Sequence, residues 1–183
     1  MKTLFVIIAL LFFNITFSYS QDIQEYVCFP CGTECDEVIH KSKGTCSVCG
    51  MELIPKERVV FNSISPEDLA RMISINEDII LLDVRTVSEY NGEAGDNPEK
   101  KAGHIKNAIN IPHRELKERI DEIKQYKERK IVVYCSHSHR SPYSCQILTD
   151  HGFTNVSNMT KGLAYWIEKG IVNIETGENL IVK

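Results

Sequence analysis

Short apolar runs alternate with amphipathic stretches from about residue 58 to the end of the chain. The apolar runs predict buried strands at residues 79–82, 107–112, 130–135 and 155–159. The amphipathic stretches predict helices at residues 66–74, 114–126, 141–152 and 162–170, and Ser65 is a natural N-cap for the first of them. Strands that alternate with helices indicate an α/β fold, in which a parallel sheet is flanked by helices on both faces.

The N-terminus has a different pattern. Lys2 precedes an uninterrupted apolar run at residues 4–13, and small and polar residues follow up to Gln21. This is the layout of a signal peptide over residues 1–20. The run is shorter than the roughly 20 residues of a bilayer span, although an uncleaved anchor is the alternative. We therefore expect an exported protein, periplasmic or secreted, with no stable membrane association after cleavage.

Composition changes this picture little. The chain has 183 residues, of which 43% are hydrophobic and 25% charged, values that are ordinary for a globular protein. Its formal net charge of −4 argues against broad binding to nucleic acid. Seven cysteines are more informative, because an odd number cannot all pair in disulfides.

Five of the cysteines crowd into a predicted module at residues 21–57. Cys28 and Cys31 form one Cys-x-x-Cys pair and Cys46 and Cys49 another, and 14 residues separate the pairs. This is the spacing of a structural zinc ribbon, in which the four thiolates hold one tetrahedral ion. A disulfide knot is the competing interpretation. Cys35 and His40 are further potential ligands without an assigned role.

The segment "YVCFPCG…GTCSVCGMELIPK" resembles the small heavy-metal-binding modules at the N-termini of metal transporters and efflux proteins. The resemblance implies metal binding. That family usually has histidine or methionine around the position of Cys31, and the thiol here favours zinc or a softer ion such as copper(I).

The candidate chemistry of the second predicted domain, residues 58–183, lies at strand ends. Asp83, Arg85 and Cys135 each follow an apolar run, and the ligand site of a parallel sheet lies outside the carboxyl ends of its strands. A helix start just beyond Cys135 and the charge of Arg140 both favour a thiolate. Loop amides around the sulfur suit covalent catalysis on an anionic substrate. A buried, inert thiol is the alternative.

Four segments resemble the rhodanese family in order and spacing: "ILLDVRTVSEY", "AGHIKNAINIP", "VVYCSHSHRS" and "GFTNVSNMTKGLAYW". The resemblance implies sulfur transfer from a thiosulfate- or persulfide-type donor to a thiol or other nucleophile, through a persulfide on Cys135. Arg140 is expected to act with Cys135 as a catalytic residue that holds the sulfur, and the matched substrate-binding loop comprises Ser136, His137, Ser138, His139 and Ser141. Asp83 and Arg85 match the family's Asp-x-Arg and are expected to support the site.

Several alternatives remain open. A phosphatase of related fold needs Cys-x5-Arg, whereas Cys135 and Arg140 form Cys-x4-Arg, a loop better sized for one sulfur atom. A non-enzymatic metal-handling or redox-relay protein is the other alternative, with His137 and His139 as metal ligands beside Cys135, or with Cys145 as its disulfide partner. We expect instead that the histidines line the pocket and that Cys145 lies in the core. Residues 91–102 predict a solvated loop, and His104 is expected to pack near a strand rather than act as a base.

Overall fold

The structure is a computed structural model that describes residues 24–173 and 175–183. The predicted signal peptide lies outside the described residues. Within them, no helix combines the length and apolar character that a membrane span requires.

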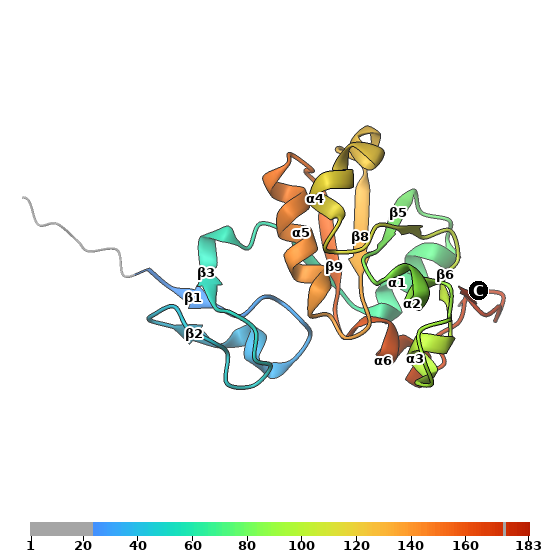
Figure 1. Cartoon of the computed structure of the whole chain (residues 1–183), viewed down its shortest axis with the longest axis horizontal. Helices are drawn as coiled ribbons and strands as arrows, with labels where there is room; N and C mark the ends of the chain where they lie inside the picture. The colour runs from blue at the N-terminus through green and yellow to red at the C-terminus, as the bar shows by residue number, and fades with distance from the viewer. Residues whose placement is uncertain (1–23, 174) are drawn as a thin grey trace, which may run out of the picture.

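A small N-terminal module precedes a larger α/β domain, as Figure 1 shows. Its sheet has three antiparallel strands in the order β2-β1-β3, formed by Tyr26–Val27 (β1), Ile39–His40 (β2) and Ile54–Pro55 (β3). Two 3-10 helices belong to this part of the chain, Glu34–Glu37 (η1) and Lys56–Arg58 (η2). Strands of two residues bury little surface, so the module depends on other contacts for its stability.

The α/β domain is built on a five-stranded sheet in the order β4-β9-β8-β5-β7, and every neighbouring pair is parallel. The strands are Asn62–Ile64 (β4), Ile79–Asp83 (β5), Ile109–Asn110 (β7), Lys130–Tyr134 (β8) and Val156–Met159 (β9). A separate antiparallel pair joins His104–Ile105 (β6) to Ile181–Val182 (β10). The prediction of a parallel sheet is confirmed.

Helices cover both faces of the sheet, because side chains of the central strand alternate between two apolar cores. Ile131 and Val133 of β8 face α5 (Arg140–Asp150), whereas Val132 and Tyr134 face α1 (Pro66–Ser74) and α6 (Gly162–Glu168). Near α5 lie α4 (Leu116–Arg119) and the 3-10 helix η3 (Ile120–Tyr126). Two short helices, α2 (Val87–Tyr90) and α3 (Pro98–Lys101), follow β5.

The structure corrects several predicted elements. The helix expected at 114–126 is α helical only at its start and continues as 3-10 helix. The expected loop at 91–102 contains α3, which begins at Pro98, a residue suited to the first turn of a helix.

Ser65 does cap α1, since its hydroxyl accepts a hydrogen bond from the Asp68 amide at 3.0 Å. His104 stacks on Tyr90 and its Nδ1 lies 3.0 Å from the Tyr90 carbonyl, as its expected packing role requires.

The N-terminal module shares a core with the α/β domain. Phe29 is buried and its ring lies 4.5 Å from that of Tyr143 on α5 and 6.1 Å from that of Phe61. The buried cysteines of the module belong to the same apolar cluster as Leu148 and Val156. Figure 1 shows the module against α5 and β9. The two parts therefore pack as one body.

Beneath the carboxyl edge of the sheet, Asp83 and Arg85 form a fully buried ion pair. The Arg85 guanidinium donates to the Asp83 carboxylate at 2.6 Å and to the Gly103 carbonyl at 2.7 Å. Burial lowers the pKa of Arg85, but the hydrogen bonds and negative charge of Asp83 outweigh it and raise that pKa overall. The pair thus has a structural role, while its expected support of the site stays a prediction.

We predict that Arg85→Ala lowers the free energy of unfolding by about 3–5 kcal/mol, because it leaves the Asp83 carboxylate buried without its cation. Urea unfolding followed by circular dichroism measures this change. Arg71→Ala is the matched control: it removes an exposed ion pair with Asp68 and should cost about 0.5 kcal/mol or less. Equal losses in the two variants would contradict the structural role of the buried pair.

Candidate functional site

Cys135 lies in the connection between β8 and α5, at the carboxyl edge of the sheet. Its side chain is buried, and Sγ lies 3.5 Å from the Ser141 hydroxyl in the first turn of α5. Residues 136–139 form a continuous bend, in which Ser138 takes a left-handed conformation with φ of 58°. The strand therefore delivers the thiol into a tightly curled loop, as its position in the sequence predicts.

The amides of this loop are free to bind a ligand. Among the described residues, none of the amides of residues 136–139 donates a hydrogen bond to a protein acceptor. No side chain caps the start of α5 either, since its N-cap residue, His139, makes no capping bond. Unsatisfied amides at a helix start attract an anion. The loop thus offers its own donors to a negatively charged sulfur.

Glu89 fixes both ends of the loop. Its carboxylate accepts two hydrogen bonds of 2.8 Å from the Arg140 guanidinium and one of 3.1 Å from the Ser136 hydroxyl. It also accepts from the amide and hydroxyl of Thr86, and this capping box holds it at the start of α2. Glu89 thereby ties the beginning of the loop to the beginning of α5.

Electrostatics favour a fixed ion pair at this point. Burial raises the pKa of Glu89, but the hydrogen bonds from Arg140 and Thr86 overcome it and hold that pKa far below its usual range. The hydrogen bonds of Glu89 raise the pKa of Arg140 against the effect of burial, and the negative charge of Cys135 raises it further. Arg140 is therefore near Cys135, but Glu89 balances its charge.

Backbone amides at the start of α6 also hold the Cys135 loop. Leu163 donates its amide to the Cys135 carbonyl at 2.8 Å, and Ala164 donates to the Ser136 carbonyl at 2.9 Å. Gly162 has φ of 71°, and a Cβ there would lie 2.4 Å from the Ser136 oxygen. Only glycine allows so close an approach of the two backbones.

The remaining cysteine and histidines near the loop do not gather around Cys135. His137 and His139 are exposed while Cys135 is buried, and the three do not form a metal-ligand group in the described part of the chain. Cys145 is fully buried within α5. Its burial, and then the charge of Cys135, raise its pKa well above the usual range. Cys145 is thus a core thiol, as expected.

A cleft of about 660 Å³ opens beside Arg140. Its lining comprises Val84, Thr86, Val87, Pro112, His113, Arg114, Glu115 and Arg140. Arg114 is exposed and has no ion-pair partner among the described residues, whereas Glu115 pairs with Arg119. The cleft therefore carries an uncompensated positive charge, although the whole chain is acidic.

His113 adds a neutral imidazole to the cleft. Its Nδ1 lies 2.8 Å from the Ser144 hydroxyl, which donates its own hydrogen to the Arg140 carbonyl. Nδ1 must therefore carry the hydrogen, and Nε2 is left as the basic nitrogen. Burial lowers the pKa of His113, and the charges of Arg140, Arg114 and Lys117 lower it further. Sequence reasoning missed Glu89, His113 and Arg114, although Thr86-x-x-Glu89 is a recognisable capping-box signal.

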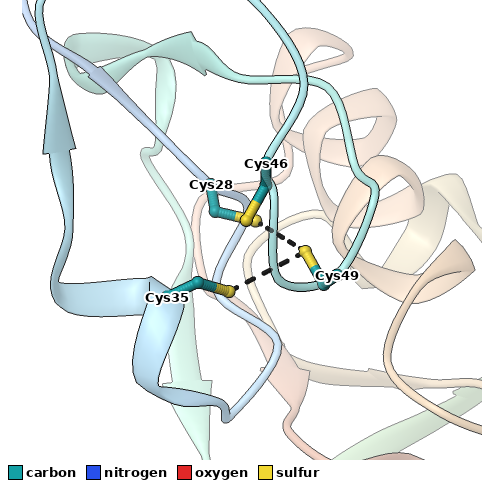
Figure 2. Close-up of side chains that lie close together, drawn as sticks. All are labelled: Cys28, Cys35, Cys46 and Cys49. Carbon is teal, nitrogen blue, oxygen red and sulfur yellow. Dashed lines mark hydrogen bonds between the residues drawn. The ribbon is translucent and has the colours of Figure 1, made fainter.

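The thiols of Cys28, Cys35, Cys46 and Cys49 converge in the N-terminal module, as Figure 2 shows. Their sulfur atoms all lie within 4.8 Å of one another, with Cys49 3.2 Å from Cys28 and 3.8 Å from Cys35. The second Cys-x-x-Cys turn is closed by the Gly50 amide, which donates to the Cys46 carbonyl. We call these four residues the thiol cluster.

The thiol cluster differs in one member from the predicted ligand set, because Cys35 stands where Cys31 was expected. The Asp36 carboxylate accepts hydrogen bonds from the backbone amides of Cys31 and Gly32. These bonds fix the backbone at Cys31, whose thiol lies outside the thiol cluster. Cys31 Sγ lies 3.1 Å from the Thr33 hydroxyl and 4.0 Å from Cys35 Sγ. The 3-10 helix η1 instead presents Cys35 to the cluster. His40 is not a member of it.

The thiol cluster suits a thiophilic cation. Three of its cysteines are buried, and burial raises the pKa of Cys28, which the neighbouring thiols Cys49 and Cys35 raise further. Hydrogen bonds from the amides of Cys49 and Val48 outweigh burial at Cys46 and lower its pKa to about 7. A bound divalent ion would let all four ionise together, since thiolates are its ligands. The donor set therefore fits a tetrahedral metal site.

Comparison with known proteins identifies both parts of the chain. The rhodanese-like domain family matches residues 65–169, more than half of the 183 residues, and the heavy metal binding domain family matches residues 25–56. The chain belongs to the rhodanese-like family. Relatives of this rhodanese-like chain include a sulfurtransferase of Allochromatium vinosum, 30% identical over 110 residues, which are 60% of the chain and 92% of that protein.

Other relatives match over a smaller share of their own length. Thiosulfate sulfurtransferase PspE of Escherichia coli is 35% identical over 42% of the chain and 64% of its own length. A tRNA uridine(34) hydroxylase of Buchnera aphidicola is 29% identical over 66% of the chain, but the chain spans only 35% of its length. The solution structure of a rhodanese-like domain from Anabaena is 28% identical, with a TM-score of 0.51, over 60% of the chain and 76% of that domain.

We predict that Cys35→Ser removes metal from the protein, whereas Cys31→Ser retains it, because only Cys35 belongs to the thiol cluster. The measurement is metal content by mass spectrometry after separate loading with zinc and copper(I), followed by gel filtration. Wild-type protein gives the reference stoichiometry. Loss of metal in Cys31→Ser and retention in Cys35→Ser would restore the ligand set that the Cys-x-x-Cys spacing suggested.

Proposed function

We propose that this protein is an exported sulfurtransferase that moves a sulfane sulfur from an anionic donor to a thiol acceptor through a persulfide on Cys135. The observation that carries the proposal is the curled loop around this thiol, whose amides have no protein acceptor among the described residues. Family membership and sulfurtransferase relatives support the same reaction class.

The loop suits a sulfur atom bound to Cys135. In the proposed first step the Cys135 thiolate attacks the outer sulfur of thiosulfate, a bond forms between the two sulfurs, and the bond to the sulfite group breaks. Sulfite leaves with the electron pair. In the second step an acceptor thiolate attacks the outer sulfur of the persulfide, takes it as a new persulfide and restores the Cys135 thiolate. The loop amides stabilise the negative sulfur in both steps.

The cleft beside Arg140 favours an anionic donor. Arg114 supplies an exposed cation without an ion-pair partner in the described part of the chain, and neutral His113 can accept a hydrogen bond at Nε2. A thiosulfate dianion, or the carboxylates of a larger persulfide, satisfies this lining. PspE, which is a thiosulfate sulfurtransferase, supports thiosulfate as the first donor to test.

Zinc is the proposed ion of the thiol cluster, because four thiolates at mutual distances below 4.8 Å fit its tetrahedral preference. It would be held by Cys28, Cys35, Cys46 and Cys49 in a structural role. Export is proposed from the signal-like pattern of residues 1–20.

The persulfide is tested directly by intact mass spectrometry. We expect wild-type protein treated with thiosulfate to gain the mass of one sulfur atom and Cys135→Ala to gain none. Cys145→Ala is the matched control, because Cys145 is a core thiol, and it should still gain the sulfur. A Cys135–Cys145 disulfide without any sulfur adduct would support a redox relay instead and contradict the proposed transfer.

We predict that Arg114→Ala raises the KM for thiosulfate by about ten-fold with little change in kcat, since one exposed charge–charge contact in the cleft is lost. Steady-state rates with a cyanide or thiol acceptor give both constants. Arg58→Ala, which removes an exposed cation paired with Asp150 outside this cleft, should leave the KM unchanged. A similar rise in both variants would mean that the cleft does not bind the donor.

A further inference from the structure

The segment between Cys28 and Cys35 is hydrogen bonded to Asn158 in β9 and to Lys161 in the turn that follows. Pro30 offers its carbonyl to the Asn158 side-chain amide at 2.7 Å, and Cys31 offers its carbonyl to the Lys161 backbone amide at 2.8 Å. These two acceptors lie between Cys28 and Cys35, which both belong to the thiol cluster. The position of the turn is therefore tied to the backbone of the metal-binding segment.

The same Asn158 amide also reaches the loop of Cys135. Its second hydrogen is donated to the Ser138 hydroxyl at 2.8 Å, and Asn158 is fully buried. A carbonyl can only accept, so Pro30 requires the nitrogen of the Asn158 side chain to face it. One buried amide group thus joins the two cysteine loops directly.

The N-terminal module is also packed closely against the residues that follow β9. Gly32 has φ of 91°, and a Cβ there would lie 2.6 Å from the Thr160 Cβ. Asn158 Oδ1 is buried and has no hydrogen-bond partner within the described residues, which is a cost that the two donated bonds must offset. An arrangement with a buried unpaired acceptor and such tight packing persists only when its surroundings fix it.

We propose that Asn158 is a positioning residue through which the metal state of the thiol cluster sets the order of the Cys135 loop. The effect on sulfur transfer rests on the proposed function, but the coupling itself does not. Metal bound by Cys28 and Cys35 fixes the intervening segment. The carbonyls of Pro30 and Cys31 then hold the Asn158 side chain and the Lys161 amide in place. The Asn158 side chain, through its hydrogen bond to the Ser138 hydroxyl, then keeps Ser138 in its left-handed conformation.

The weakness of the module on its own supports this direction of control. Its sheet consists of three two-residue strands, so the order of the segment depends on the metal and on packing against the α/β domain. Ser138 needs external support because a left-handed conformation is unfavourable for a residue with a Cβ. Loss of metal should therefore loosen the Cys135 loop and weaken the hydrogen bonds that its carbonyls accept from Leu163 and Ala164.

Hydrogen exchange by mass spectrometry tests the coupling on full-length protein, loaded with zinc or stripped by a chelator. We expect exchange of the Leu163 and Ala164 amides, which donate to the Cys135 and Ser136 carbonyls, to be on the order of five-fold faster in the wild type without zinc, the factor that one net hydrogen bond supplies. In Asn158→Ala the exchange should be fast in both states, although zinc content is unchanged. A metal-dependent difference that persists in Asn158→Ala, or no difference in the wild type, overturns the proposal.

A second pair of variants acts from the module side. Gly32→Ala forces the module away from Thr160, so it should lose the metal dependence of exchange, whereas Gly44→Ala meets no atom within 4 Å and should retain it. If Asn158→Ala fails to fold, this pair alone decides: equal behaviour of Gly32→Ala and Gly44→Ala contradicts the coupling.

Persulfide formation is measured in the same samples. Its absence from zinc-loaded wild type refutes the proposed function, while the exchange data still judge the coupling.

Discussion

Two cysteine loops depend on the backbone amides and one side chain of a short segment, from the end of β9 to the start of α6. Residues 158–164 donate hydrogen bonds to the carbonyls of Pro30 and Cys31 on one side and of Cys135 and Ser136 on the other. Buried carbonyls without donors are costly, so neither loop can shift without this segment. The thiol cluster and Cys135 are far apart in sequence but are held by one structural element. The heavy metal binding domain is therefore linked by hydrogen bonds, through these residues, to the loop of Cys135.

The second constraint is electrostatic. Because Glu89 neutralises Arg140, the loop at Cys135 would, in the proposed sulfur transfer, stabilise a negative sulfur through backbone amides rather than through net charge. Preorganised amides do not need to reorient when the charge moves from donor to Cys135 to acceptor. The unpaired charge lies instead at Arg114 on the edge of the cleft. Donor attraction and sulfur stabilisation are thus assigned to different groups, so a change in donor preference need not disturb the reacting loop.

Much of the fold and the position of the proposed nucleophile follow from local pattern. The run Lys130–Tyr134 before Cys135 has the composition of a buried parallel strand, and the structure places it at the centre of the sheet. The strand Asn62–Ile64 was missed because an edge strand of three residues has no apolar run. Choosing Cys35 over Cys31 depends on hydrogen bonds to Asp36, and the reach of Glu89 to Arg140 spans 51 residues. Such tertiary contacts leave no periodic signal in a sequence.

Linkage makes the proposed coupling reciprocal. If metal in the thiol cluster favours the ordered loop, then a sulfur held by that loop must strengthen metal binding by the same factor, because both ligands select the same state. The path runs through Asn158 and the Lys161 amide, so both effects should disappear together when this path is broken. The thiol cluster need not contact the sulfur, and the Cys135 loop need not contact the metal. A persulfide enzyme built in this way retains metal best while it carries sulfur, and it orders its nucleophile best while it carries metal.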